Sequence, residues 1–141
     1  THSVDSVKYT ALLLREHRWF ALFVFECRYR YAPATGTNNS FWIMTRSRPV
    51  QWFEIAINEG HFPNEVNGME SHTYALEWNK EELMYLFDGP GNSPNIGDIC
   101  HGPALVYPSL AIMKWSGPVT DAIDGVSIDV DYVRVWQRLA E

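Results

Sequence analysis

The chain has few cysteines, no excess of positive charge and no long apolar run. Two cysteines, Cys27 and Cys100, are too few for a scaffold built from disulfides. The formal net charge of −6 argues against nucleic acid as a partner, because a nucleic-acid binder normally carries a basic face. No stretch is long and apolar enough to span a membrane, so no membrane partner is expected. A single domain over residues 1–141 is the expected organisation.

Signatures of cofactor and metal sites are also missing from the sequence. No Cys/His cluster has zinc spacing, and no glycine-rich phosphate loop or Ser-His-Asp order stands out. Asp129 and Asp131 alternate on an expected strand, but two acids fall far short of the six to eight oxygens that Ca²⁺ takes. We therefore expect neither a cofactor nor a metal.

What the chain has is apolar and aromatic side chains, at 46% and 14% of its residues. Residues 19–31 alternate from Phe23 onward, which predicts a strand with Cys27 on its buried aromatic side. A buried free thiol is the expectation for Cys27, and a bridge to Cys100 stays open in an oxidising compartment. Pro33 to Asn39 indicate a loop. Further strands are expected at 41–45, 50–58, 72–78, 82–88, 105–115 and 127–136, with loops at 60–68, 90–103 and 117–125. Many short strands indicate an all-β sandwich or jelly roll of two antiparallel sheets.

Two glutamates, Glu54 and Glu59, are the main chemical signal. Their odd spacing of five residues would put them on opposite faces of a regular strand. A β-bulge between Ala56 and Glu59 would bring both onto one face, and bulges are common beside active sites. Glycoside hydrolysis uses such a pair of carboxylates. On spacing alone, a solvated strand edge is the more common meaning of two such acids.

The surrounding segments strengthen the signal because they resemble family-16 glycoside hydrolases, the laminarinase, agarase and carrageenase type. Glu54 and Glu59 match the nucleophile and the general acid/base of that family's Glu-x-Asp-x-x-Glu motif, and Ala56 occupies the slot of the middle Asp. Ordered matches elsewhere are Val24-Phe25-Glu26, Ser40-Phe41-Trp42, His72 to Trp78 followed by Phe87-Asp88-Gly89, and Asp129 to Trp136. The resemblance implies a jelly roll, a polysaccharide or oligosaccharide substrate, and a secreted or periplasmic location.

The chain departs from the family at the middle position of the motif and in its length. Alanine at position 56 offers no carboxyl to hydrogen-bond Glu54 or to influence its ionisation. The chain is also short for the family, and Gly60 to Ser71 reads as a loop where relatives have further strand. One or more strands are therefore expected to be missing. Exposed sheet edges would then favour self-association.

Other aromatic and histidine residues are candidates for sugar contact. Trp52 precedes the site motif and is expected at the site, whereas core packing and sugar contact are equally weighted for Trp42 and Trp115. His72 is a candidate subsite residue, with a structural role as the more common alternative. The other tryptophans, Trp19, Trp78 and Trp136, are expected in the core.

Three functions remain open on the sequence. The first is a retaining endo-glycosidase of a β-linked polysaccharide, such as a β-1,3-glucan or a marine galactan, weakened by Ala56. The second is a non-catalytic carbohydrate-binding descendant of such an enzyme. The third is a structural β domain without a ligand. The glutamate pair favours the first, and Ala56 with the missing strand favours the second.

Overall fold

A computed structural model of the chain describes residues 12–13, 20–45, 53–62, 70–90, 93–96 and 104–139. These residues form strands and two short 3₁₀ helices. The strands are β1 (Leu12–Leu13), β2 (Phe20–Arg30), β3 (Thr37–Met44), β4 (Glu54–His61), β5 (His72–Trp78), β6 (Glu82–Phe87), β7 (Ser93–Ile96), β8 (Leu105–Ile112) and β9 (Asp129–Leu139). The 3₁₀ helices η1 (Lys114–Ser116) and η2 (Asp121–Ile123) lie between β8 and β9. The expected all-β class is confirmed.

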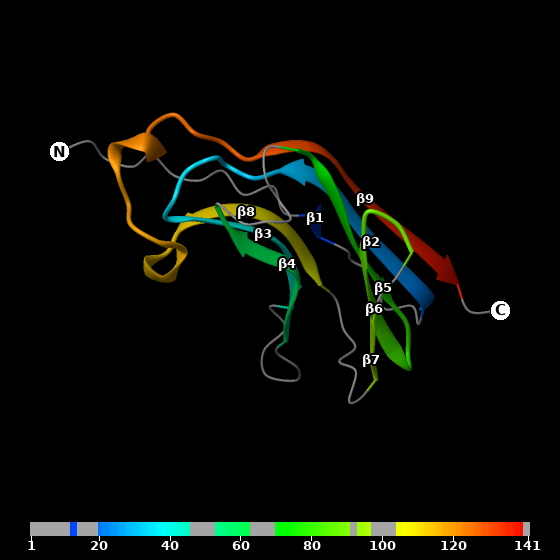
Figure 1. Ribbon diagram of the computed structural model, residues 1–141. Coiled ribbons are helices and arrows are strands. Elements are labelled where there is room, and N and C mark those ends of the chain that lie inside the picture. Colours follow the sequence, from blue (N-terminus) through cyan, green and yellow to red (C-terminus); the bar gives the residue numbers. More distant parts are fainter. Residues whose placement is uncertain are drawn as a thin grey trace.

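The strands form two antiparallel sheets that pack as two layers (Figure 1). The four-stranded sheet has the order β1-β8-β3-β4, and the five-stranded sheet has the order β7-β6-β5-β2-β9. Each sheet combines strands that follow one another in the chain, such as β3 and β4 or β5 and β6, with neighbours from distant parts of the sequence, such as β3 and β8 or β2 and β9, as in a jelly roll. Strand β4 pairs with β3 on one side, and no described strand pairs with its other side.

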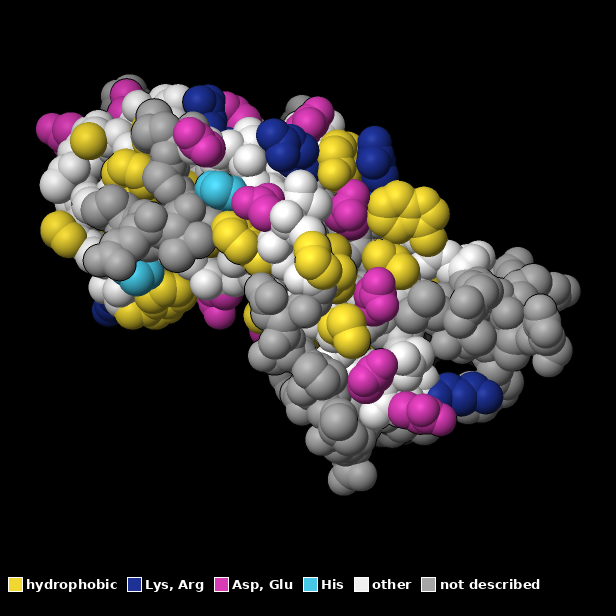
Figure 2. Space-filling view, turned by 45° about the vertical axis from the view of Figure 1, so that its right-hand side comes forward, with side chains coloured by type: hydrophobic (Ala, Val, Ile, Leu, Met, Phe, Trp, Pro, Cys, Tyr) yellow, Lys and Arg dark blue, Asp and Glu magenta, His cyan; other side chains and the backbone are white. Residues whose placement is uncertain are grey.

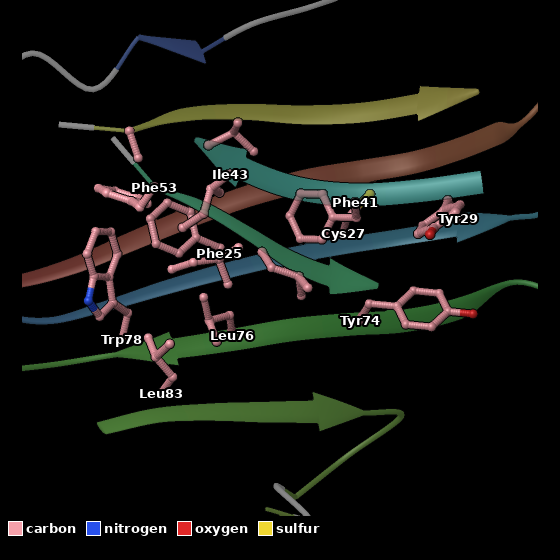
Figure 3. Close-up of a cluster of buried hydrophobic side chains, with 14 of the residues drawn as sticks. Phe25, Cys27, Tyr29, Phe41, Ile43, Phe53, Tyr74, Leu76, Trp78 and Leu83 are labelled. Carbon is pink, nitrogen blue, oxygen red and sulfur yellow. The ribbon is translucent and has the colours of Figure 1, made fainter. Parts of the chain in front are cut away.

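The core fills the space between the two layers with aromatic and aliphatic side chains. Phe25, Cys27 and Tyr29 of β2 are fully buried, as their alternation predicts. They face Phe41 and Ile43 of β3 across the sandwich (Figure 3). Cys27 is a free thiol, which confirms the expectation of an unbridged cysteine, whereas Cys100 lies outside the described residues.

A tight hairpin joins β5 and β6. Asn79 Oδ1 accepts hydrogen bonds from the backbone N–H groups of Glu81 at 2.8 Å and Glu82 at 2.9 Å. The Asn79 side chain thus completes the turn between the two strands, a common role for Asn. The register places Trp78 opposite Leu83, and both are buried, so the expected core position of Trp78 is confirmed.

Several boundaries differ from the sequence-based expectation. Strand β3 begins at Thr37, inside the expected loop 33–39, because Thr37, Asn38 and Asn39 pair with β8. Strand β4 continues through Gly60 and His61, and β7 lies within the stretch 90–103 that we expected to be irregular. Pairing with a neighbouring strand outweighs the turn preference of Asn, Gly and Pro at these places.

The outer face of the five-stranded sheet carries alternating charges. Arg28 pairs with Asp131 at 3.3 Å, and Arg30 pairs with Asp129, so both aspartates discussed above have arginine partners. Figure 2 shows Lys and Arg side chains standing beside acidic ones in this view, without a continuous basic area among the described residues. The face therefore resembles an ordinary solvated sheet surface.

Trp136 departs from its expected place in the core. It lies opposite Val24, on the side of β2 that faces away from the core, and its side chain is 46% exposed. The prediction for Trp136 is wrong because the ladder between β2 and β9 puts it on the outer face. In the part of the chain that the structure describes, no helix is long and apolar enough to cross a membrane.

Candidate active site

The expected bulge is present in β4. Phe41 of β3 lies opposite Asn58, whereas the next residue, Trp42, lies opposite Ala56, so Ile57 is the extra residue. An extra residue reverses the alternation of side chains beyond it. Glu54 and Glu59 therefore project from the same face despite their odd spacing, and both are exposed. This is the outer face of the four-stranded sheet, referred to below as the β4 face.

The antiparallel ladder identifies the neighbours of both glutamates, since directly opposed residues share a face. Met44 lies opposite Glu54, Trp42 opposite Ala56, and Ser40 opposite Glu59. Trp42, for which core packing and sugar contact are equally weighted on the sequence, thus lies next to the alanine in the middle of the motif.

Aromatic and hydroxyl groups extend the β4 face onto β8. The rings of Trp42 and Tyr107 stack with centroids 4.5 Å apart and an interplanar angle of 19°. Trp42 Nε1 donates a hydrogen bond to Ser109 Oγ at 3.0 Å. Packing and this hydrogen bond hold the indole in one orientation, which suits it as a rigid surface for the C–H face of a sugar ring.

Glu59 has a defined hydrogen-bond partner on β3. Asn38 Nδ2 donates to Glu59 Oε1 at 2.9 Å, and Ser40 Oγ donates to Asn38 Oδ1 at 3.2 Å. Asn38 and Ser40 are both buried, at 4% and 6% exposure, although Glu59 itself is exposed. The glutamate head group is therefore tied to the sheet at one of its two oxygens.

The bulge is held from beneath by a polar group in the core. Asn58 Oδ1 accepts hydrogen bonds from the hydroxyls of Tyr29 at 2.5 Å and Tyr31 at 2.8 Å. Burial is the main cause that raises the pKa values of Tyr29 and Tyr31 above the ordinary range, so both hydroxyls stay protonated as donors. Anchoring Asn58 toward the core leaves the adjacent Glu59 pointing outward.

Close packing under the bulge also explains Gly60. A Cβ atom at this position would lie 2.3 Å from the hydroxyl oxygen of Tyr31 and 2.9 Å from its Cε2. Tyr31 is stacked on Tyr29, with ring centroids 5.7 Å apart, so it has little freedom to retreat. A side chain directly after Glu59 would therefore overlap Tyr31 and force it to move.

Trp115 lies at the end of the β4 face beyond Glu59. It belongs to η1 and is 55% exposed. Its ring lies edge-on to the ring of His61, with the two ring centroids 5.9 Å apart. His61 lies opposite Asn38 and so on the same face as Glu59. An exposed tryptophan held in this way is available to a ligand on the β4 face.

Not every expected site residue lies on the β4 face with Glu54 and Glu59. His72 belongs to β5 in the other sheet, where its Nδ1 lies 2.6 Å from Asp88 Oδ2 and its ring packs against Phe87. It thus belongs to a different sheet from Glu54 and Glu59, and its contacts with Asp88 and Phe87 are those of a structural histidine. Trp52 and Trp19 lie outside the described residues.

Several residues of the site carry no signal that stands out in the sequence. Asn38 and Ser40 sit in a polar run, Thr37-Asn38-Asn39-Ser40, that resembles a loop. Their even spacing with Trp42 is the one available hint, because residues two apart share a strand face. Tyr107, Ser109 and Asn58 become recognisable only once the sheet register is known. Among the described residues, no group of three or more His, Cys, Asp or Glu side chains is placed to hold a metal ion.

Neither a protein-family model nor a curated protein sequence matches this chain. Solved structures do match. A laminarinase from Flavobacterium sp. UMI-01 superimposes with a TM-score of 0.66 at 20% identity, over 87% of this chain and 69% of that protein. The catalytic domain of a laminarinase from Thermotoga petrophila RKU-1 gives a TM-score of 0.65 at 15% identity, over 84% of this chain and 63% of that one.

A third match is a non-specific endo-β-1,3(4)-glucanase from family GH16, with a TM-score of 0.66 at 21% identity, over 89% of this chain and 61% of that protein. The chain thus spans 61% to 69% of the length of these three proteins. Such identities establish architecture alone, and on that ground the chain has the fold of the family-16 glycoside hydrolases.

Proposed function

We propose that the β4 face hydrolyses a β-linked polysaccharide with retention of configuration. The observation that carries this proposal is the bulge at Ile57, which puts Glu54 and Glu59 on one face beside the stacked pair Trp42 and Tyr107. A regular strand would have separated the two carboxylates, so the bulge is the feature that makes a shared reaction centre feasible.

In this proposal Glu54 is the nucleophile, and Glu59 acts first as the general acid and then as the general base. The carboxylate of Glu54 attacks the anomeric carbon, while Glu59 gives its proton to the departing glycosidic oxygen. Water, deprotonated by Glu59, then releases the sugar from Glu54. This double displacement needs carboxyl groups about 5–5.5 Å apart. Ala56 weakens the reaction because no carboxyl stands beside Glu54 at the middle position of the motif.

A β-1,3-glucan is the substrate class we favour. Two of the structural matches are laminarinases and the third is a β-1,3(4)-glucanase, and these matches are our ground for preferring a β-glucan to a marine galactan. Trp42 and Trp115 would provide stacking surfaces on the β4 face for the sugar rings. The second candidate is carbohydrate binding without hydrolysis, and Ala56 is the observation that favours it.

One pair of assays separates these functions. Release of reducing ends is measured on laminarin, lichenan, agarose and carrageenan, and binding to the same polymers is measured by affinity electrophoresis. Hydrolysis of a β-glucan, with the β-anomer formed first in proton NMR spectra, supports the retaining enzyme. Binding without release supports the second candidate. Neither binding nor release on any polymer would leave a structural domain and contradict both.

A further inference from the structure

Hydrogen bonds at both ends of the Asn38 amide fix its orientation. A carboxylate only accepts hydrogen bonds, so the partner that faces Glu59 must be the NH₂ end of the Asn38 side chain. The other end, Oδ1, accepts from Ser40 Oγ at 3.2 Å, which is consistent with the same orientation. The chain Ser40–Asn38–Glu59 therefore has a single direction of donation.

The bond reaches only one of the two oxygens of Glu59. It ends on Oε1, which keeps an acceptor lone pair whether the carboxyl is ionised or carries a proton on Oε2. Asn38 can donate to Oε1 in both states. Proton exchange with a substrate is thereby directed to Oε2.

We propose that Asn38 is a positioning residue that holds Glu59 so that Oε2 transfers the proton, a role that rests on the proposed hydrolysis. Glu59 is exposed and has a long, rotatable side chain, whereas Asn38 is buried in β3. In the first step the Oε2 proton moves to the glycosidic oxygen as its bond to the anomeric carbon breaks and the bond from Glu54 forms. In the second step Oε2 takes a proton from the attacking water. Asn38 stays bonded to Oε1 throughout and touches no reacting atom.

The register explains why this pair forms. Ser40 lies directly opposite Glu59, and Asn38 lies opposite His61, two residues further along β4. Asn38 and Glu59 are thus diagonal neighbours on one face, within reach of side chains of this length. The bulge at Ile57 is required for this geometry, since without it Glu59 would leave the face that Asn38 shares.

The test compares two substrates that differ in their need for a proton. Hydrolysis of a β-glucan requires protonation of the leaving sugar, whereas a dinitrophenyl β-glycoside loses its stable phenolate without it. In Asn38→Ala, we expect kcat on the β-glucan to fall about 10-fold with little change in KM, the effect of one hydrogen bond to a charged group. The kcat/KM for the aryl glycoside, which reports formation of the glycosyl-enzyme, should stay close to that of the unaltered protein.

Two further variants keep the test decisive if Asn38→Ala folds poorly. Asn38→Asp preserves the shape but replaces the donor by an acceptor, so it should lose at least as much β-glucan activity. Ser40→Ala frees the amide to rotate and should show a smaller loss of the same selective kind. Ser109→Ala is the matched control, because it removes a hydrogen bond on the same face that does not reach Glu59. Any change it causes should act through Trp42 and appear mainly in the KM for the β-glucan, with little change in kcat.

Each outcome decides between the two proposals. Selective loss on the β-glucan supports the positioning role. Equal loss on both substrates, or no loss, overturns that role while the unaltered protein's hydrolysis leaves the proposed function standing. If the unaltered protein releases no reducing ends from any polysaccharide, the proposed function fails, and the role of Asn38 fails with it.

Discussion

Ala56 lies directly opposite Trp42 on the ladder between β4 and β3, with Glu54 two residues away on the same face. A side chain at position 56 therefore projects beside the indole and toward the neighbourhood of Glu54. The position is exposed, so a larger group can be introduced there without disturbing the core.

Replacing Ala56 by Asp is expected to increase hydrolysis. A carboxyl at this position can share a hydrogen bond with Glu54 and help to control its ionisation as the covalent intermediate forms and breaks. A positioned proton-handling group is typically worth about 10²–10⁴-fold in rate. Release of reducing ends by both proteins gives the measurement, with circular dichroism to confirm equal folding.

Ala56→Asn is the matched control, because it has the same size without the acid. A gain in both variants would mean that volume, not the carboxyl, matters. No gain with binding retained supports a carbohydrate-binding protein, and no gain without binding leaves the structural domain.

Glu54→Gln and Glu59→Gln should each abolish hydrolysis. An amide neither attacks the anomeric carbon well nor donates a proton. Both side chains are exposed, so the free energy of unfolding should change by no more than about 0.5 kcal/mol. Rates and urea denaturation curves of the purified variants are the measurements, and unchanged turnover in either variant would remove that residue from the mechanism.

Asn58→Leu should destabilise the protein by about 1–3 kcal/mol, because the hydroxyls of Tyr29 and Tyr31 lose their shared acceptor in the core. Urea denaturation measures the change. The control is the variant that also carries Tyr29→Phe and Tyr31→Phe, which removes the two hydroxyls that donate to Asn58. That variant should recover much of the lost stability, and failure to recover it would mean that the shape of Asn58 matters more than its hydrogen bonds.

Gly60→Ala is expected to cost about 1–3 kcal/mol of unfolding free energy through overpacking, since the new methyl group would overlap Tyr31. The measurement is again chemical denaturation. Combining Gly60→Ala with Tyr31→Leu should give less than the sum of the two single effects, because the smaller side chain relieves the overlap. Strict additivity would show that the cost arises elsewhere.

Stability should depend on pH through Asp88. Partial burial raises the pKa of this carboxyl, but hydrogen bonds from the Thr73 backbone and His72 outweigh it and hold the pKa below the ordinary value. A lowered pKa in the folded state stabilises the protein above the unfolded-state pKa of about 3.9, and the stabilisation is lost as the pH falls through the folded-state pKa.

Asp88→Asn should therefore be less stable than the parent near neutral pH, and the difference should shrink in acid. Denaturation midpoints between about pH 7 and pH 3 give the comparison. Asparagine suits this position because residue 88 has a φ of 47°, which Asn tolerates. A difference that stays constant over this range would contradict the assigned role.

The sequence was sufficient for some features because they depend on local patterns. The alternation of Phe25, Cys27 and Tyr29 identifies a buried face, and the odd spacing of Glu54 and Glu59 predicts a bulge if the two act together. Both follow from the two-residue period of a strand.

Other features depend on which strands become neighbours, and no local pattern reports that. In the sequence Asn38 resembles a loop residue, and only the pairing of β3 with β8 shows that it belongs to a strand. Trp136 likewise resembles a core residue, and only its register on β9 shows that it lies on the outer face. His72 is a candidate for sugar contact in the sequence, and only the topology assigns it to the other sheet.

The pairing of β2 with β9 also bears on how the protein is made. The two strands lie side by side in the five-stranded sheet, yet Arg30 and its partner Asp129 are 99 residues apart in the chain. Contacts between such distant residues form slowly, because a long loop must close first. During translation, β2 therefore cannot pair with β9 until residues 129–139 have left the ribosome. Until then, the edge of β2 that pairs with β9 stays unpaired and accessible to other nascent chains.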